Sequence, residues 1–247
     1  IDAQLTTEIF GLFSPTKPDF SIKMSKLPIQ TTARKEAQEI AEFYVRMYSN
    51  ASNPKKFKSI KEQMFWLANE SRSMLNNDLY PSKMYDYIKD LYDSGIKWEQ
   101  TRDSIYYRYQ VNQKDEYNIT SKNLYCNGCY AAGINFASSL VSLFYGEGNL
   151  KETIKIGTLA GWDSDNPTST WGGLIGFIIG REMVEKEFNM KLSNKFNIHR
   201  TRKNFSKDGI DTFENMAKNG IKIVDKVVLE ELNGKIDSEN KLWLIPK

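Results

Sequence analysis

The sequence predicts an all-α protein formed by one domain that spans residues 1–247. Three observations lead to this fold class. Apolar residues recur at helical spacing through most of the chain, and helix start signals precede several of these segments. No internal repeat, linker or low-complexity tract divides the sequence. A chain of 247 residues, of which 40% are hydrophobic, is also long enough to bury one sizeable core.

The first half of the chain predicts an irregular beginning followed by helices. Pro15, Pro18 and Pro28 predict an irregular stretch after a short first element. Ser59 and Glu62 have the spacing of a capping box, which predicts that a helix begins there. The segments with helical spacing of apolar residues lie at residues 37–47, 60–74, 84–91 and 98–109.

The second half of the chain predicts two helices and one ambiguous segment. Residues 131–145 are mostly apolar and predict a buried helix. A shorter amphipathic helix is predicted at residues 150–159, where Asn149 and Glu152 resemble a capping box. The valine-rich residues 221–232 are compatible with a helix or a strand.

The charge and hydropathy of the chain argue against two classes of partner. A net charge of +3 comes from nearly balanced acids and bases, and no dense basic run is interleaved with aromatic residues, so we expect no nucleic-acid surface. No apolar segment approaches the roughly 18–20 residues that span a bilayer, so we expect no membrane partner. The sequence does not indicate a cellular compartment.

Cys126 and Cys129 form a C-x-x-C pair, which is typical of half a zinc site, a redox motif or a short disulfide. Zinc requires four ligands, and His199 is the single histidine, so a structural zinc site is disfavoured. We interpret the cysteines as two small buried thiols at a helix start. His199 is interpreted as a structural or solvated residue rather than a catalytic one.

A glycine-spaced apolar segment follows the most polar loop of the chain. Gly172, Gly176 and Gly180 recur every four residues and so predict one face of a helix that begins near residues 168–171. Each glycine costs about 1 kcal/mol of helix stability relative to alanine. We therefore expect another backbone to approach this face closely.

Two aspartates lie two residues apart in the loop before this predicted helix. One interpretation is that one of Asp163 and Asp165 caps the helix while the other is solvated. The alternative is a divalent-metal site, because hard cations prefer carboxylate, amide and hydroxyl oxygens, and Asn166 and Thr168 follow directly. The local pattern by itself leaves both interpretations open.

Three segments carry a resemblance to a known family. G-W-D-S-D-N-P-T-S-T-W-G-G-L-I-G, residues 161–176, is similar to a D-[ST]-D-[TC] signature followed by a small-residue-rich helix. Residues 134–154 are similar to an L-x-x-L-x-Y-G-x-G-D-F segment, and residues 1–15 to I-G-A-Q-I followed by E-x-[FW]-G. Along the chain the three segments occur in the order of the ADP-ribosylglycohydrolase family, and together they resemble that family, which includes the dinitrogenase reductase-activating glycohydrolases and the J1 crystallins.

The resemblance implies an orthogonal helical bundle that binds two Mg²⁺ ions and hydrolyses the glycosidic bond between ADP-ribose and a side chain, or a related N- or O-glycoside. The expected partner is an ADP-ribosylated protein or a small ADP-ribose-like ligand. The implied metal ligands are Asp163, Asp165, and Asn166 or Thr168. The implied substrate contacts are Gln4, Asn135 and Trp162.

The chain also departs from the family pattern. In the family, a Thr-Asp-Asp motif and the catalytic acid lie before the I-x-A-Q segment, and this chain has no counterpart of either. We expect that half of the ligand set outside this chain, in an upstream segment or a separate N-terminal fragment of the same protein. D-S-D-N is also one residue shorter than the D-S-D-C-N of the nearest branch. The alternative function is therefore a non-catalytic member that binds ADP-ribose-like ligands or serves structurally.

Overall fold

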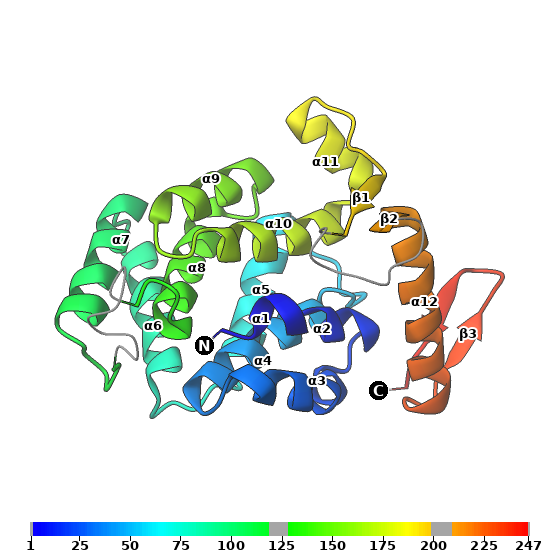
Figure 1. The fold of residues 1–247 in the computed structure, drawn as a ribbon, viewed down its shortest axis with the longest axis horizontal. Coiled ribbons are helices and arrows are strands. Elements are labelled where there is room, and N and C mark those ends of the chain that lie inside the picture. The colour runs from blue at the N-terminus through cyan, green and yellow to red at the C-terminus, as the bar shows by residue number, and fades with distance from the viewer. Residues whose placement is uncertain (1, 119–127, 199–208, 247) are drawn as a thin grey trace.

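The computed structural model describes residues 2–118, 128–198 and 209–246, and it is mainly helical as predicted (Figure 1). The helices of the first half are α1 (Gln4–Thr7), α2 (Ile9–Phe13), α3 (Pro18–Thr32), α4 (Glu36–Asn50), α5 (Ile60–Arg72), α6 (Tyr80–Asp93), α7 (Trp98–Ile105) and the π-helix η1 (Tyr106–Val111). The later helices are α8 (Ala132–Gly146), α9 (Leu150–Ala160), α10 (Asp165–Ile179), α11 (Arg181–Phe188) and α12 (Phe213–Glu230). None of the described helices is both long and apolar enough to cross a membrane.

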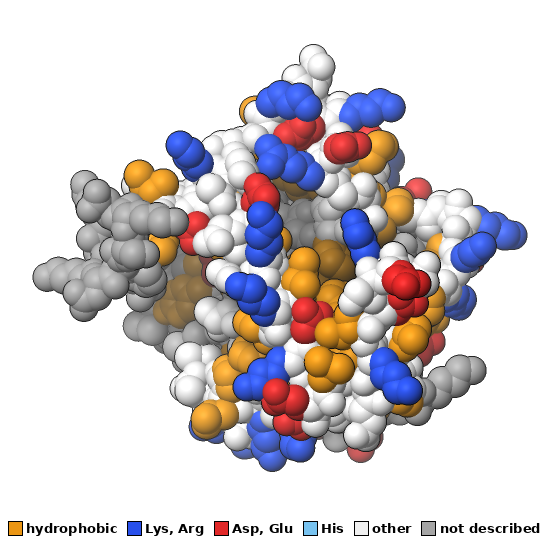
Figure 2. Space-filling model, turned by 90° about the vertical axis from the view of Figure 1, so that its right-hand side faces the viewer, with side chains coloured by type: hydrophobic (Ala, Val, Ile, Leu, Met, Phe, Trp, Pro, Cys, Tyr) orange, Lys and Arg blue, Asp and Glu red, His pale blue; other side chains and the backbone are white. Residues whose placement is uncertain are grey.

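Strands are few and short in the described part of the chain. β1 (Lys195–Asn197) pairs antiparallel with β2 (Ile210–Thr212), and β3 (Lys235–Asp237) pairs antiparallel with β4 (Leu242–Leu244). Figure 2 views the molecule from the side of α12 and the β3–β4 hairpin, where apolar side chains lie exposed among charged ones. Both strand pairs are therefore additions to the helical part of the fold and do not form its core.

Two predicted helix starts are confirmed by their caps. Ser59 Oγ accepts a hydrogen bond from the Glu62 N–H at 3.1 Å, and α5 follows. Asn149 Oδ1 accepts from the Glu152 N–H at 2.9 Å, and α9 follows. The ambiguous residues 221–232 lie mostly within α12 and are helical, with Val224, Val227 and Val228 buried on one face.

The irregular stretch predicted from three prolines is largely wrong. Pro15 does lie in a turn, but Pro18 occupies the first position of α3, where its missing N–H would be unsatisfied in any residue. Pro28 lies inside the same helix. The helix continues through Pro28 because Ser25 and Ile29 are buried in the packing of α3 against α4. Tertiary packing here outweighs the local cost of proline.

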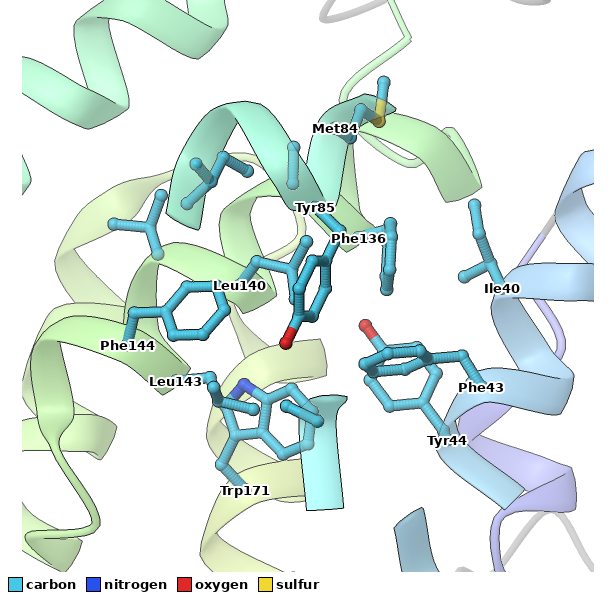
Figure 3. Close-up of a cluster of buried hydrophobic side chains, with 14 of the residues drawn as sticks. Ile40, Phe43, Tyr44, Met84, Tyr85, Phe136, Leu140, Leu143, Phe144 and Trp171 are labelled. Carbon is cyan, nitrogen blue, oxygen red and sulfur yellow. The ribbon is translucent and has the colours of Figure 1, made fainter. Parts of the chain in front are cut away.

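The core is built around α8, which is buried on nearly all sides and packs against α4, α6, α7, α9 and α10. Figure 3 shows aromatic side chains from several helices that converge on it. Phe43 of α4 lies 5.1 Å from Phe136 of α8, measured between ring centroids, and Tyr44 lies 5.4 Å from Trp171 of α10. Trp171 Nε1 also donates to the Ser139 carbonyl at 2.8 Å. The core therefore places the middle of α10 beside α4 and α8.

The helix predicted after the polar loop exists, but its boundaries differ from the prediction. α10 begins at Asp165, several residues before the expected start, and residues 174–179 are helical. It ends at Ile179, and Gly180 follows with φ +79°, outside the helix. Asp165 therefore lies in the first helical turn, whereas Asp163 lies in the preceding loop.

The close backbone approach predicted for this glycine face is also wrong. A Cβ at Gly172 would lie 3.6 Å from the Ile154 side chain, and one at Gly176 would lie 3.7 Å from Val184, which are ordinary contacts. The tight approaches occur elsewhere. A Cβ at Gly11 would lie 2.4 Å from the backbone oxygen of Val45, where α2 meets α4.

Alanine substitutions should separate these two kinds of glycine. Gly11→Ala is expected to lower the free energy of unfolding by about 1–3 kcal/mol, because the added carbon overpacks against backbone. Gly172→Ala should be neutral or raise it by up to about 1 kcal/mol, because alanine favours the helix and the added carbon would make only ordinary contacts. Urea denaturation of both variants measures the two values. Equal losses at the two positions would contradict this assignment of tight packing.

Candidate functional site

Three segments that are distant in sequence meet at the start of α10. The side-chain amide of Gln4 on α1 lies 3.0 Å from Asn166 Oδ1. Asn166 Nδ2 donates to Asp163 Oδ2 at 3.1 Å. The Asp163 backbone N–H donates to Asn135 Oδ1 of α8, also at 3.1 Å. The structure thus brings Gln4, Asn135, Asp163 and Asn166 into one hydrogen-bonded network.

The local backbone explains how the two aspartates come to lie at a helix N-terminus. Gly161 and Trp162 have φ values of +96° and +55°, which turn the chain sharply after α9. The Asp163 carbonyl then accepts from the Asn166 N–H at 3.0 Å as α10 begins. No side-chain cap hydrogen bond is made at the N-cap residue, Ser164. The unpaired N–H groups of the first turn favour negative charge at this position.

Asn135 holds the loop that precedes α10. It is fully buried, and its Nδ2 donates to the carbonyls of Cys129 and Ala131, at 3.0 and 3.2 Å. These two donated bonds fix which way the amide points, so its oxygen faces the Asp163 N–H. Asn135 therefore holds the backbone of Asp163 in place.

The two predicted metal ligands lie side by side. Burial raises the pKa of Asp163, and its side-chain contact with Asp165 and the negative charge of Asp165 raise it further. The hydrogen bond from Asn166 opposes this rise. Asp165 is exposed, whereas Asp163 is partly buried. Two neighbouring carboxylates of this kind gain stability when a cation or a proton lies between them.

Asp2 belongs to the same network, although the sequence analysis did not select it. The Gln4 backbone N–H donates to Asp2 Oδ1 at 3.2 Å. With the Gln4 side-chain amide turned so that its nitrogen faces Asp2, this nitrogen donates to the same oxygen at 2.8 Å. Burial raises the pKa of Asp2 to about 6, and the negative charge of Asp163 adds to the rise. The signal in the sequence was the aspartate of I-D-A-Q, where the family motif has glycine.

Glu8 is a second acidic residue that the sequence analysis did not select. Its Oε2 accepts from Thr170 Oγ1 of α10 at 3.0 Å. Burial raises the pKa of Glu8 to about 7, against the effect of hydrogen bonds with Thr170 and Tyr48, and the charge of Asp2 adds to the rise. The sequence pattern that could have identified Glu8 is the glutamate of E-x-[FW]-G, in the segment of residues 1–15 that resembles the family.

Two other predicted site residues lie apart from this network. Thr168 Oγ1 donates to the carbonyls of Ser164 and Asp165, at 3.0 and 2.9 Å, and its methyl group faces Gly157 of α9. The structure therefore places Thr168 on a different face of α10 from Asn166. Trp162 is partly buried and packs against the main core.

The donor set fits part of a magnesium shell. Asp163, Asp165 and Asn166 offer carboxylate and amide oxygens, and Mg²⁺ commonly binds through one or two carboxylates while it keeps several waters. Within residues 2–118, 128–198 and 209–246, no group of three or more His, Cys, Asp or Glu residues is placed to hold a metal ion. The second ion, with ligands from outside this chain, stays a prediction.

The cysteine interpretation needs correction. Cys129 is disulfide-bonded and is not a free thiol, so the prediction of two buried thiols is wrong for this residue. The C-x-x-C spacing alone does not distinguish a thiol from a disulfide, because both are small and apolar. Cys126 and His199 lie outside the described residues.

A shallow groove between the end of α6, the start of α7 and the end of α8 is lined by aromatic and acidic residues. Its Glu147 is already bound by Lys61 Nζ at 2.8 Å and by the Tyr92 hydroxyl. The Tyr92 ring in turn stacks on Phe144. Its acidic residue Glu147 is therefore already paired, and the groove does not contain the residues of the network around Asp163.

Comparisons with known proteins gave no match: no family model matches the chain, and no curated protein and no solved structure is significantly similar to it.

Proposed function

We propose that this site binds Mg²⁺ and ADP-ribose, and that the protein is a magnesium-dependent hydrolase. Its reaction would cleave the glycosidic bond between ADP-ribose and a protein side chain, or a related N- or O-glycoside. One observation carries the proposal. Gln4, Asn135 and the Asp163–Asn166 segment come from the three separate segments of the resemblance, and they share one hydrogen-bonded network.

The residues of the network would divide the work between metal and substrate. Asp163 and Asp165 would hold the ion through their adjacent carboxylates. Asn166 would add a third ligand once its side-chain amide turned its oxygen from Gln4 toward Asp163. Bound Mg²⁺ would supply a Lewis acid and a template for the sugar hydroxyls. Gln4 has a side-chain amide that can donate to and accept from a ribose hydroxyl beside Asn166. Asn135 would hold the backbone of Asp163 in the position that these contacts need.

The second candidate is a non-catalytic protein that binds ADP-ribose-like ligands. The observation that favours it is the small number of acidic ligands, because the described residues contain no group of three or more that could hold an ion. Two ions bound at one catalytic centre need further ligands. A single ion held by Asp163 and Asp165 is sufficient for a binding site.

One pair of measurements tests both candidates on the same sample, a protein that includes the upstream segment expected to carry the other metal ligands and the catalytic acid. ADP-ribose is titrated calorimetrically into the protein with about 5 mM Mg²⁺ and again with EDTA, and ADP-ribose released from ADP-ribosylated proteins is quantified alongside. We expect binding that requires Mg²⁺. Release together with binding supports the hydrolase, and binding without release supports the non-catalytic candidate. No binding in saturating Mg²⁺ would contradict both.

A further inference from the structure

Asp2, Gln4, Asn166 and Asp163 form a row of hydrogen-bonding groups at the candidate site, which we call the amide relay. One end of the Gln4 side-chain amide lies 2.8 and 3.1 Å from the two carboxylate oxygens of Asp2. Its other end lies 3.0 Å from the Asn166 amide. The opposite end of the Asn166 amide lies 3.1 Å from Asp163 Oδ2. The relay therefore has a carboxylate at each end, two amides between them and three junctions.

Counting hydrogens shows that one junction of the amide relay lacks a donor. Each amide has an N–H end and a carbonyl end, and an ionised carboxylate only accepts. Two amides thus supply two donors along the relay, whereas its three junctions need three. Whichever way the amides turn, two acceptors face each other at one junction. Gln4 and Asn166 are buried, with exposed fractions of 0% and 2%, so they depend on the relay for these hydrogen bonds.

Two orientations of the amides keep the hydrogen bond between Gln4 and Asn166. In the first, Asn166 Nδ2 donates to Asp163, and Gln4 Nε2 donates to Asn166. Gln4 Oε1 then faces the two acceptors of Asp2. In the second, the Gln4 nitrogen donates to Asp2 and the Gln4 oxygen accepts from Asn166. Asn166 Oδ1 then faces Asp163, because the two ends of one amide group turn together.

The second orientation presents two oxygens where a cation can lie between them. Asn166 Oδ1 then takes the place of the nitrogen that lies 3.1 Å from Asp163 Oδ2. Mg²⁺ binds oxygen at about 2.0–2.1 Å in an octahedral shell, so neighbouring ligand oxygens lie about 2.9 Å apart. The spacing in the structure is close to this value. A cation at this junction therefore removes the mismatch that the two amides cannot remove.

Asp2 favours the orientation that suits the cation. Its carboxylate attracts a Gln4 nitrogen and repels a Gln4 oxygen at the same place, and hydrogen bonds to an ionised acceptor are roughly twice as strong as neutral ones. The Gln4 backbone N–H also donates to Asp2 Oδ1 at 3.2 Å, which holds the carboxylate there. With the Gln4 nitrogen on Asp2, the Gln4 oxygen faces Asn166 and attracts its nitrogen. The Asn166 oxygen is thereby directed to Asp163.

We propose that Asp2 is a positioning residue, which acts through Gln4 to turn the Asn166 oxygen toward Asp163 and so prepares it as a cation ligand. Asp2 itself does not contact the cation. This inference deepens the proposed function and rests on it, because it requires Mg²⁺ between Asp163 and Asn166.

The amide relay makes the more conservative change at Asp2 the more harmful one for Mg²⁺ binding. Asp2→Asn supplies a third donor, so all three junctions are filled in the first orientation, with the Asn166 nitrogen toward Asp163. Asp2→Ala removes the same charge but favours neither orientation. We expect Asp2→Asn to weaken Mg²⁺ binding about tenfold, which corresponds to one hydrogen bond. Asp2→Ala should weaken it only about two- to threefold, through the loss of charge.

Calorimetric titration with Mg²⁺ measures these affinities on the protein with its upstream segment, as for the ADP-ribose titration. It is run at about pH 8, because Asp2, with a pKa of about 6, is then ionised. The control is Asp90→Asn, which neutralises an exposed aspartate on α6 and should keep the wild-type affinity. Equal weakening by Asp2→Asn and Asp2→Ala would overturn the proposal, because a charge effect alone does not distinguish the two variants.

Gln4→Met interrupts the amide relay with a side chain of similar size and so tests the route. In a Gln4→Met background, Asp2→Asn should weaken Mg²⁺ binding no more than about two- to threefold, because the added donor no longer reaches Asn166. A tenfold loss in both backgrounds would refute a route through Gln4. If Gln4→Met does not fold, the comparison of Asp2→Asn with Asp2→Ala decides alone.

Melting in EDTA tests the count of donors in the absence of a cation. Asp2→Asn should melt about 2–5 °C above the wild type at pH 8, because the third junction gains its donor. An Asp2→Asn protein that melts no higher than the wild type would refute the count. If the wild type does not bind Mg²⁺, the proposed function fails together with the role of Asp2 in cation binding. If it binds Mg²⁺ and both Asp2 variants weaken binding equally, only the positioning role fails.

Discussion

Asp163→Asn and Asp165→Asn should each abolish the Mg²⁺-dependent rise in melting temperature. Without Mg²⁺ both variants should melt within a few degrees of the wild type, because an asparagine oxygen can still accept from Asn166 and the repulsion between the two carboxylates is relieved. With Mg²⁺ at about 100 times its dissociation constant, the wild type gains about 2.7 kcal/mol, which corresponds to roughly 5–10 °C. The variants lose it because carboxylates dominate affinity for hard cations.

The matched control is Asp90→Asn, which neutralises an exposed aspartate on α6. It should change neither the melting temperature nor the response to Mg²⁺. Thermal unfolding with EDTA, with Mg²⁺ and with an equal ionic strength of NaCl separates specific binding from screening. An undiminished Mg²⁺ effect in both site variants would exclude Asp163 and Asp165 as ligands. Their role would then be limited to the charge at the N-terminus of α10.

Trp171→Ala should cause the largest loss of stability among these variants, about 3–5 kcal/mol. Trp171 is fully buried, its ring lies 5.4 Å from Tyr44, and its Nε1–H is bound to the Ser139 carbonyl. Removal of the indole leaves a cavity between α4, α8 and α10 and leaves that carbonyl without the donor. Urea denaturation gives the free energy of unfolding directly, provided that the slope of the transition is unchanged.

Phe177→Ala is the control on the same helix, because Phe177 is 48% exposed. It should cost less than about 1 kcal/mol. A loss of comparable size in both variants would mean that α10 is stabilised along its whole length and not through Trp171. A loss below about 1 kcal/mol for Trp171→Ala would contradict the packing around which the site is built.

The sequence by itself determined the helical fold class and several element boundaries, because these depend on neighbours along the chain. Apolar spacing defines the buried face of a helix such as α4, and caps such as Ser59 and Asn149 satisfy N–H groups only three residues away. Local pattern also singled out Asp163 and Asp165 as helix-capping or metal-binding residues, and it left both interpretations open. These conclusions needed no knowledge of what lies across the fold.

Only the tertiary structure decided which distant residues join the aspartates. Asp2 and Glu8 are ordinary acids in the sequence, and their environment arises from the packing of α1 and α2 against α4 and α10. The same packing buries Ile29 beside Pro28, so that α3 continues through the proline. The packing of α9 beside Gly172 leaves room for ordinary contacts with an added Cβ. Burial, desolvation and close approach are properties of pairs of surfaces. The sequence pattern shows which residues of a segment form an apolar or polar surface, but it does not show which other segment packs against that surface.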